Sequence, residues 1–304
     1  MRKYQKVRFD PFGLPYSYDN LGNRTSVTHN DNTASYTPNS LNQYTSRTVP
    51  GIFDVAGAAD AGSTVTVTDP VTGTSGTDRR GQYFFQGHAM DNSSAAVWRM
   101  LTINAPGSNP PSMQMPAYLQ RTAESFTYDL DGNLLTDGTW AYTYDAENRV
   151  IWIEITVAAR NGGHPWQALN LAYDYLGRRG LKQYYLNTGS WALLSNQTFV
   201  YDGWNVMAVI EGGAVTQNFF WGLDLSGTMQ GAGGVGGLLM MQQGGNTHLP
   251  AYDLLGNVHA MIKASDGSIA AAYEYDAFGN TLRESGPDAG SMPFRFSTKY
   301  TDIE

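Results

Sequence analysis

Aspartates in short acidic turns are the residues of this sequence best placed to do chemistry. Asp follows Tyr at seven positions, and Gly or Asn stands three residues after each Asp. The pairs are Asp19 with Gly22, Asp129 with Gly132, Asp145 with Asn148, Asp174 with Gly177, Asp202 with Asn205, Asp253 with Gly256, and Asp276 with Gly279. Carboxylates could bind calcium, but the segment 129–133 lacks the later bidentate Glu of a calcium loop. We therefore expect structural turns, with no metal and no cofactor.

Turn closure explains the spacing of these residues. An Asp side chain at the first corner of a type I turn accepts a hydrogen bond from the backbone two residues on. Gly and Asn then supply the positive φ that closes the hairpin loop with a bulge. The sequence predicts positive φ at Gly132, Gly177, Gly256 and Gly279. Two segments without the Tyr, 10–13 and 224–227, also fit the pattern.

Other catalytic patterns are missing from the sequence. There is no Cys and no GxSxG motif, and the glycine run at 231–237 lacks the Gly-Lys-Ser/Thr ending of a phosphate loop. The histidines show no metal-binding spacing and are expected to be ordinary surface or loop residues: His29, His88, His164, His248 and His259. The sequence therefore predicts a protein that is not an enzyme.

Charge narrows the choice of partner. Nineteen Lys and Arg against 27 Asp and Glu give a net charge of −8, which disfavours nucleic acid as a partner. No apolar run typical of a signal peptide follows the basic start, and no segment has the length and apolarity of a membrane span. We expect a secreted or cell-surface protein whose export route the sequence does not reveal.

The elements that must position the turns are short strands. Aromatic residues two apart precede several of the Asp residues, as at Tyr142 and Tyr144 or Tyr273 and Tyr275, and such pairs fall on one face of a strand. Glycine is abundant, and Asp greatly outnumbers Glu. The fold class predicted is all-β, a long antiparallel sheet of hairpins that coils, with a small β-sandwich-like insertion.

Composition divides the chain into five parts. Tyr-Asp strands are expected over 1–48 and again over 121–290. Residues 49–105 have no Tyr-Asp unit and alternate in the manner of a small sandwich. The proline-rich segment 106–120 is predicted to be a linker, because proline cannot donate to a strand ladder. Residues 291–304 form the last part.

The repeated segments YDNLGNRT, YDLDGN, YDAENRV, YDYLGRR and YDLLGNV resemble the YD repeats of RHS (rearrangement hot spot) proteins. The closing run from Tyr273 resembles the start of the RHS-associated core domain, here truncated. The resemblance implies a hollow β-shell that encloses a C-terminal polypeptide, often a toxin, released by aspartyl self-cleavage. Asp302 stands where one core aspartate is expected, but it lacks a matching carboxylate, and Thr301 precedes it where many members have Arg. We expect no self-cleavage.

Two functions follow as expectations. The first is a non-catalytic scaffold, a shell fragment that encloses or displays a larger polypeptide. The alternative is an extracellular module that binds carbohydrate or a cell surface through exposed aromatic rings. Expected partners are other shell segments or an enclosed polypeptide, with glycans in the alternative. Unpaired strand edges near 7–18 and 293–300 predict edge-to-edge self-association.

Overall fold

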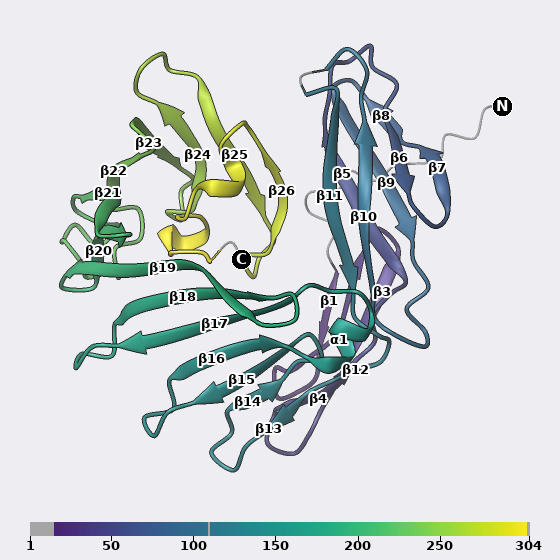
Figure 1. Ribbon diagram of the computed structural model, residues 1–304, viewed down its shortest axis with the longest axis horizontal. Coiled ribbons are helices and arrows are strands. Elements are labelled where there is room, and N and C mark those ends of the chain that lie inside the picture. The colour runs from purple at the N-terminus through teal and green to yellow at the C-terminus, as the bar shows by residue number, and fades with distance from the viewer. Residues whose placement is uncertain (1–14, 109, 303–304) are drawn as a thin grey trace. The chain divides into compact units, whose positions relative to one another are not determined.

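The chain is almost entirely β-structure, as predicted, and forms two compact units (Figure 1). The computed structural model describes residues 15–108 and 110–302, so the segment 10–13 and the start of the predicted N-terminal edge lie outside the described residues. Unit 1 runs to Gln167 and unit 2 begins at Ala168. No helix in the described parts of the chain is long and apolar enough to cross a membrane.

Unit 1 begins with a five-stranded antiparallel sheet. Its strands, in spatial order, are β1 (Tyr16–Tyr18), β2 (Arg24–His29), β3 (Asn32–Pro38), β4 (Tyr44–Arg47) and β12 (Glu124–Ser125). Strands β4 and β12 are neighbours although more than seventy residues separate them, and Glu124 pairs with Arg47. The backbone N–H of Val49 donates to Thr122 Oγ1 over 3.1 Å. The intervening chain therefore leaves this sheet and returns to it at one place.

That intervening chain forms two small sheets around a core of its own. One sheet has the order β11-β10-β6-β7 and the other β5-β9-β8. The strands are β5 (Ile52–Ala58), β6 (Thr66–Asp69), β7 (Gly73–Gly76), β8 (Asp78–Arg80), β9 (Tyr83–Ala89), β10 (Val97–Asn104) and β11 (Ser112–Leu119). Val55, Val67 and Leu101 are fully buried between them. The sequence pattern predicted this sandwich-like insertion, but with different bounds.

The predicted linker at 106–120 is wrong, because β11 occupies most of it. Strand β11 pairs with β10 along its whole length, and Pro116 stands opposite Met100. The proline is tolerated because β11 is an edge strand, so the N–H that proline lacks is not needed by a second neighbour.

A sheet of 14 strands follows in strict sequence order from β13 to β26. Its first part lies in unit 1 and contains β13 (Thr127–Tyr128), β14 (Leu134–Thr136), β15 (Trp140–Tyr144), β16 (Val150–Ile155) and the short helix α1 (Val157–Asn161). Strand β17 (Trp166–Tyr173) crosses the boundary between the units. Unit 2 holds β18 (Arg179–Asn187), β19 (Trp191–Asp202), β20 (Asn205–Glu211), β21 (Ala214–Trp221), β22 (Leu238–Gln243), β23 (Asn246–Tyr252), β24 (Val258–Lys263), β25 (Ile269–Tyr275) and β26 (Thr281–Ser285). The long antiparallel run of hairpins is thus confirmed.

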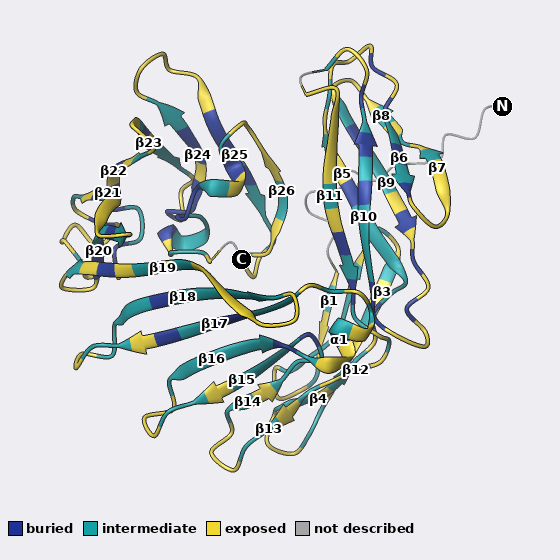
Figure 2. Ribbon diagram, in the orientation of Figure 1, coloured by how far each residue is buried: buried dark blue, intermediate teal, exposed yellow. Residues whose placement is uncertain are grey.

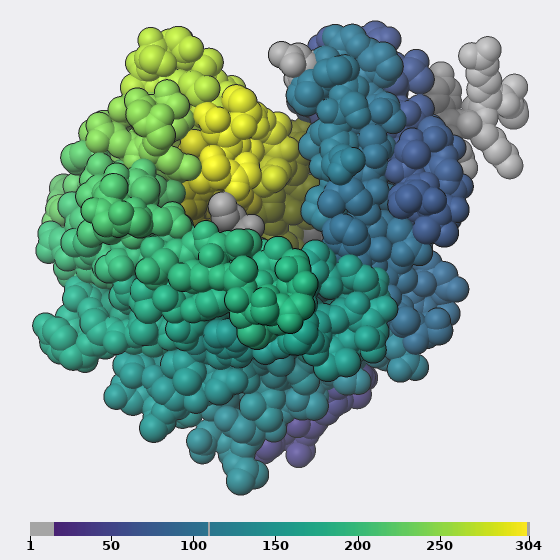
Figure 3. All heavy atoms as spheres, in the orientation of Figure 1, coloured from purple at the N-terminus to yellow at the C-terminus, as the bar shows by residue number. Residues whose placement is uncertain are grey.

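The core of unit 2 lies between one face of its sheet and the C-terminal segment. Several strands of this sheet carry buried residues, drawn in dark blue in Figure 2, and Phe219, Met241 and Met261 are among the buried residues. Two 3₁₀ turns, η1 (Ala289–Ser291) and η2 (Phe296–Thr298), pack on this face, and Figure 3 shows the C-terminal atoms in yellow beside the green strands. The predicted C-terminal strand edge at 293–300 is therefore wrong. The segment folds back as a cover because its apolar side chains bury, and β26 is the last strand.

Candidate functional site: the Tyr-Asp turns and the C-terminal segment

Six of the seven Tyr-Asp turns share one hydrogen-bond pattern. In the turn after Tyr128, Asp129 Oδ1 accepts hydrogen bonds from the backbone N–H of Asp131 at 3.0 Å and of Asn133 at 2.8 Å. The N–H of Gly132 donates to the Asp129 carbonyl, and Gly132 has a φ of +88°. These bonds hold the carboxylate in its charged form, and the pKa of Asp129 is lowered chiefly by its hydrogen bond to the Asn133 side chain.

The positive φ values occur where the sequence placed them. They are Gly22 at +88°, Asn148 at +59°, Gly177 at +77°, Gly256 at +77° and Gly279 at +88°. Each preceding Asp side chain accepts a hydrogen bond from the backbone N–H two residues on: Asp19, Asp145, Asp174, Asp253 and Asp276. The turn chemistry inferred from spacing is therefore the turn chemistry observed.

A fifth position completes the turn, and the spacing argument missed it. The residue four after the Asp is Asn or Arg in all six turns, and its side chain donates to the second carboxylate oxygen, Oδ2. The six residues are Asn23, Asn133, Arg149, Arg178, Asn257 and Asn280. The sequence carries this signal plainly, as Asn or Arg directly after each Gly or Asn.

The prediction of the same turn at Asp202 and Asn205 is wrong. These two residues pair with each other at the ends of β19 and β20, so only Gly203 and Trp204 form the loop. Gly203 has the positive φ, +55°, which the sequence placed at Asn205. The physical reason is Val206, which stands four residues after the Asp and cannot donate to its carboxylate. Without that bond, the tighter two-residue hairpin forms.

A further turn, at Asn39, was not predicted because Asn replaces Asp there. Asn39 Oδ1 accepts from the backbone N–H of Leu41 and of Gln43, and Asn42 has a φ of +60°. An amide oxygen can close the turn as a carboxylate does. The sequence shows Asn-x-x-Asn three residues after Tyr36, as Asp145 follows Tyr142 by three residues. The segment 224–227, which fits the pattern without the Tyr, also forms a turn, and Gly227 has a φ of +75°.

A hydrogen bond of the tyrosine hydroxyl explains why Tyr precedes Asp in the repeat. In five of the seven pairs the hydroxyl donates to a backbone carbonyl just past the preceding turn. Tyr144 donates to Leu134 at 2.8 Å, and Tyr275 donates to Val258 at 2.8 Å. Tyr128, Tyr201 and Tyr252 make the same kind of bond. These five hairpins are thus each tied to the one before, and burial raises the pKa of the five phenols.

The C-terminal segment binds the sheet of unit 2 through an aromatic cluster. Phe294 is 2% exposed, and its ring lies 4.9 Å from Phe219 and 5.3 Å from Trp221 between centroids. Tyr300 lies 5.3 Å from Phe199 and pairs with Phe294 in an isolated bridge. These edge-to-face contacts bury large rings at favourable geometry. The segment is therefore held as a packed part of unit 2.

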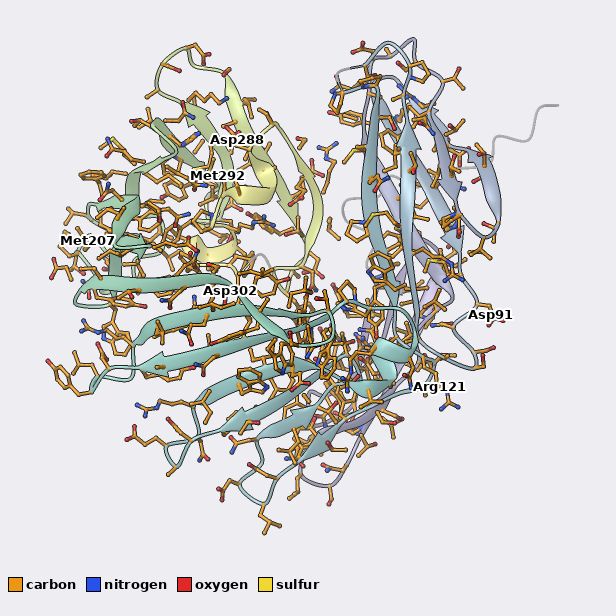
Figure 4. The ribbon with its side chains drawn as sticks, viewed as in Figure 1. Asp91, Arg121, Met207, Asp288, Met292 and Asp302 are labelled. Carbon is orange, nitrogen blue, oxygen red and sulfur yellow. The ribbon has the colours of Figure 1, made fainter. Side chains whose placement is uncertain are left out.

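Asp302 ends this segment in contact with two cations of β18. Arg179 Nη1 donates to Asp302 Oδ2 at 2.5 Å, and the buried Lys182 Nζ donates to Asp302 Oδ1 at 3.1 Å. Figure 4 labels Asp302. Burial opposes ionisation, yet the hydrogen bond and charge of Arg179, with the charge of Lys182, hold the pKa of Asp302 below its usual value. An acid catalyst needs the opposite environment. The geometry is that of an ion pair which fastens the segment.

A cavity of about 420 Å³ lies beside this ion pair within unit 2. Arg178, Arg179 and Lys299 contribute charge to its lining, and Trp204 and Trp221 contribute rings. The cations already have partners: Arg178 binds Asp174, and Lys299 Nζ donates to the Gly233 carbonyl. Arg178 and Lys299, two of the cations that line the cavity, are therefore held by partners within unit 2.

Two of the five histidines are buried, contrary to the expectation of surface or loop positions. His88 on β9 is 5% exposed because its Nε2 lies 2.9 Å from the buried Asp69 carboxylate. His248 on β23 faces the core of unit 2, with Asp288 at 3.5 Å. No group of three or more possible ligands for a metal ion occurs among the residues that the structure describes.

Unit 1 also buries a carboxyl that the sequence did not single out. Glu124 contacts Arg47 at 2.5 Å, and its side chain is 1% exposed. Burial raises the pKa of Glu124 to about 7, against the charge of Arg47 and with the help of Asp137. Asp137 is in turn bonded by the N–H groups of Thr139 and Trp140. Strand β12 has only two residues, so the sequence pattern around Glu124 does not predict that its carboxyl is buried.

These features define an all-β protein built of YD-repeat hairpins, and the chain resembles the RHS proteins in its repeats and in its closing run. No family model matches the chain. Over 185 residues, or 60% of its length, it is 28% identical to the tRNA3(Ser)-specific nuclease WapA of Bacillus spizizenii. The chain spans 7% of the length of that nuclease.

Solved structures of similar arrangement are much longer chains too. One is the crystal structure of TcdB2-TccC3, at 15% identity and a TM-score of 0.42, with 95% of this chain and 15% of that chain covered. Another is a Photorhabdus luminescens Tc holotoxin pore, at 16% identity and a TM-score of 0.42, with 95% and 14% covered.

Proposed function

We propose that this chain is a non-catalytic scaffold, a segment of an RHS-type β-shell that encloses or displays polypeptide on one face of its sheet. The observation that supports it is the C-terminal segment. Residues 286–302 cross the face of unit 2 and bury Met292, Phe294 and Tyr300 against the strands. A sheet that holds the chain's own downstream polypeptide in this way has the surface a shell segment requires.

The proposed partners are other shell segments and an enclosed polypeptide, in a protein that is secreted or on the cell surface. The chain covers a small fraction of the proteins it matches, which agrees with its being one segment of a larger assembly. Asp302 binds Arg179 and Lys182, which supports a role in fastening the C-terminal segment. The alternative of carbohydrate binding rests on exposed rings such as Tyr175 and Trp204, and we do not favour it over the scaffold role.

Hydrogen exchange tests the scaffold role directly. Amides of residues 292–302 should exchange slowly in the wild-type chain. Phe294→Ala should release them, because it removes the ring that contacts Phe219 and Trp221. Phe278→Ala is the matched control, since that ring lies on a turn and is 52% exposed. Exchange of the wild-type segment at the rate of unfolded chain would refute the proposal.

A nuclease assay tests the absence of catalysis. The similar protein WapA is named for cleavage of a tRNA, so purified chain should be incubated with total bacterial tRNA. We expect no cleavage, and we expect the purified chain to remain a single band on a denaturing gel. A discrete tRNA fragment, or a shorter chain product lost in Asp302→Asn, would contradict the non-catalytic assignment.

A further inference from the structure

A row of carboxamides crosses the sheet face of unit 2 that holds the C-terminal segment. Phe199 and Phe219 are buried on this face against the rings of that segment. Gln197 and Gln217 each stand two residues before one of these rings in the same strand, so their side chains lie on the same face. Gln243 on β22 lies directly opposite Gln217. We name these three glutamines the amide row.

A cavity of about 750 Å³ lies along the amide row. All three glutamines line it, and so does Ser291 of the C-terminal segment. Among the described residues of the lining, Glu211 alone is charged and none is aromatic. Glu211 lies opposite Gln197, and its carboxylate already accepts a hydrogen bond from Ser195 Oγ at 2.6 Å. A cavity of this size suits a small ligand or a short length of chain, and its lining suits an uncharged polar one.

The amide row includes two buried acceptors that lack a donor. Gln197 Oε1 and Gln217 Oε1 accept no hydrogen bond from any residue in the described part of the chain. The nitrogen of the second carboxamide is engaged, because Gln217 Nε2 donates to Gln243 Oε1 at 3.1 Å. A buried acceptor without a donor is unfavourable, so a ligand that supplies a donor to it gains binding energy. The cavity therefore favours a ligand that brings hydrogen-bond donors.

Carboxamides of unit 2 already hold polypeptide by its main chain. Gln243 Nε2 donates to the carbonyl of Ser291 at 3.5 Å, and Asn257 Oδ1 accepts from the backbone N–H of Ser297 at 2.7 Å. Both serines belong to the C-terminal segment, and Ser291 also lines the cavity. A carboxamide carries donors and an acceptor, as a peptide unit does, so it can bond irregular backbone in either direction. A sugar, by contrast, would find no ring to stack on among the described lining residues.

We propose that the amide row binds a second length of polypeptide, beside the C-terminal segment, through its main chain. Backbone N–H groups of this polypeptide donate to Gln197 Oε1 and Gln217 Oε1. Such recognition depends on the peptide units and not on the side chains, so uncharged polypeptides of many sequences fit. The site rests on the proposed enclosure of polypeptide and deepens it, because it gives the place and the chemistry by which enclosed chain is held.

Nitrogen–proton correlation NMR observes the side-chain amides directly. The probe is a synthetic peptide of alternating Gly and Ser, which offers main chain without charged or large apolar side chains. A second peptide, N-methylated at every residue, keeps the carbonyls and loses the backbone N–H donors. Maltohexaose is the sugar probe. Gln197→Met with Gln217→Met removes both acceptors and keeps the side-chain length. Gln183→Met is the matched control, because Lys182 lies opposite Gln197 and Gln183 therefore lies on the other face. Circular dichroism checks that each variant is folded.

We expect the Gly-Ser peptide to shift the side-chain amide signals of Gln197 and Gln217 until they saturate. The N-methylated peptide should bind wild type at least tenfold more weakly, and the double variant should bind the Gly-Ser peptide at least tenfold more weakly than the Gln183→Met control does. Equal binding of the two peptides to wild type would overturn main-chain recognition, whatever the variants do. Tighter binding of maltohexaose would make the cavity a sugar site and overturn the proposal.

The outcomes for the amide row and for the scaffold role are separable. Unshifted amide signals together with slow hydrogen exchange in 292–302 would refute the site and leave the scaffold role standing. Saturable peptide binding together with exchange of 292–302 at the rate of unfolded chain would refute the scaffold role and support the site.

Discussion

Gly177 and Gly256 offer a matched test of what turn glycines contribute. Both have a φ of +77° in the same turn type and in the same unit, so replacement by Ala imposes the same backbone strain. They differ in space. Nothing lies within 4 Å of a Cβ at Gly177, whereas a Cβ at Gly256 would lie 2.6 Å from Val235 Cγ1 and 3.0 Å from Leu225 Cδ1.

Backbone strain and steric contact together give the expected loss of unfolding free energy in each variant. A left-handed Ala costs about 1 kcal/mol, so Gly177→Ala should lower the free energy of unfolding by about that amount. Gly256→Ala adds a steric cost of about 1–3 kcal/mol, for a total of about 2–4 kcal/mol. The carbonyl of Gly256 also accepts from Thr298 Oγ1 at 2.7 Å, so a shift of this turn would disturb the C-terminal segment.

Urea unfolding of the wild type and both variants, followed by tryptophan fluorescence, measures the difference. Gly177→Asn is the control for strain alone, because Asn tolerates positive φ, and it should be close to neutral. Equal destabilisation by the two Ala variants would refute the role of packing at Gly256. A neutral Gly177→Ala would refute the strain term itself.

Three further results are expected. The raised pKa of Glu124 means that the folded state holds this proton more tightly than the unfolded state does. The free energy of unfolding of unit 1 should therefore fall as the pH rises from about 4.5 to about 7. Glu124→Gln should remove this pH dependence from the unfolding curves. Tyr275→Phe should lower the free energy of unfolding by about 1 kcal/mol, since the Val258 carbonyl loses its hydroxyl partner, whereas Tyr175→Phe at an exposed turn should be neutral. Asp302→Asn should speed hydrogen exchange in 292–302 and lower the free energy of unfolding by about 2 kcal/mol, because the buried Lys182 loses a carboxylate partner. Unchanged exchange would contradict the ion-pair role.

The sequence predicted the turns well because their bonds are local. In the Asp129 turn the side-chain hydrogen bonds to the Asp129 carboxylate join residues within four positions, so spacing alone identifies these partners. The same locality explains the error at Asp202, where one residue, Val206, decides between two turn types. The rule was sound, but it was incomplete by one position.

Features that depend on distant residues could not be predicted in this way. The strand at 112–119 forms because β10 offers it a partner along its full length, which outweighs the preference of its proline for irregular chain. Asp302 meets Arg179 and Lys182 only because the last residues fold back across the sheet. Burial of Glu124 depends on Arg47, seventy-seven positions earlier, in the pair with β4. No local pattern records these meetings.

The neighbouring placement of β4 and β12 has a consequence for how such chains change over time. Because Val49 bonds directly to Thr122, the chain between them begins and ends at nearly the same point. A segment attached in this way can be lengthened, exchanged or lost, with a short loop left behind, and the strands on either side keep their register. The two ends of the sandwich insertion are thus close enough for a short loop to replace it while β4 and β12 stay paired.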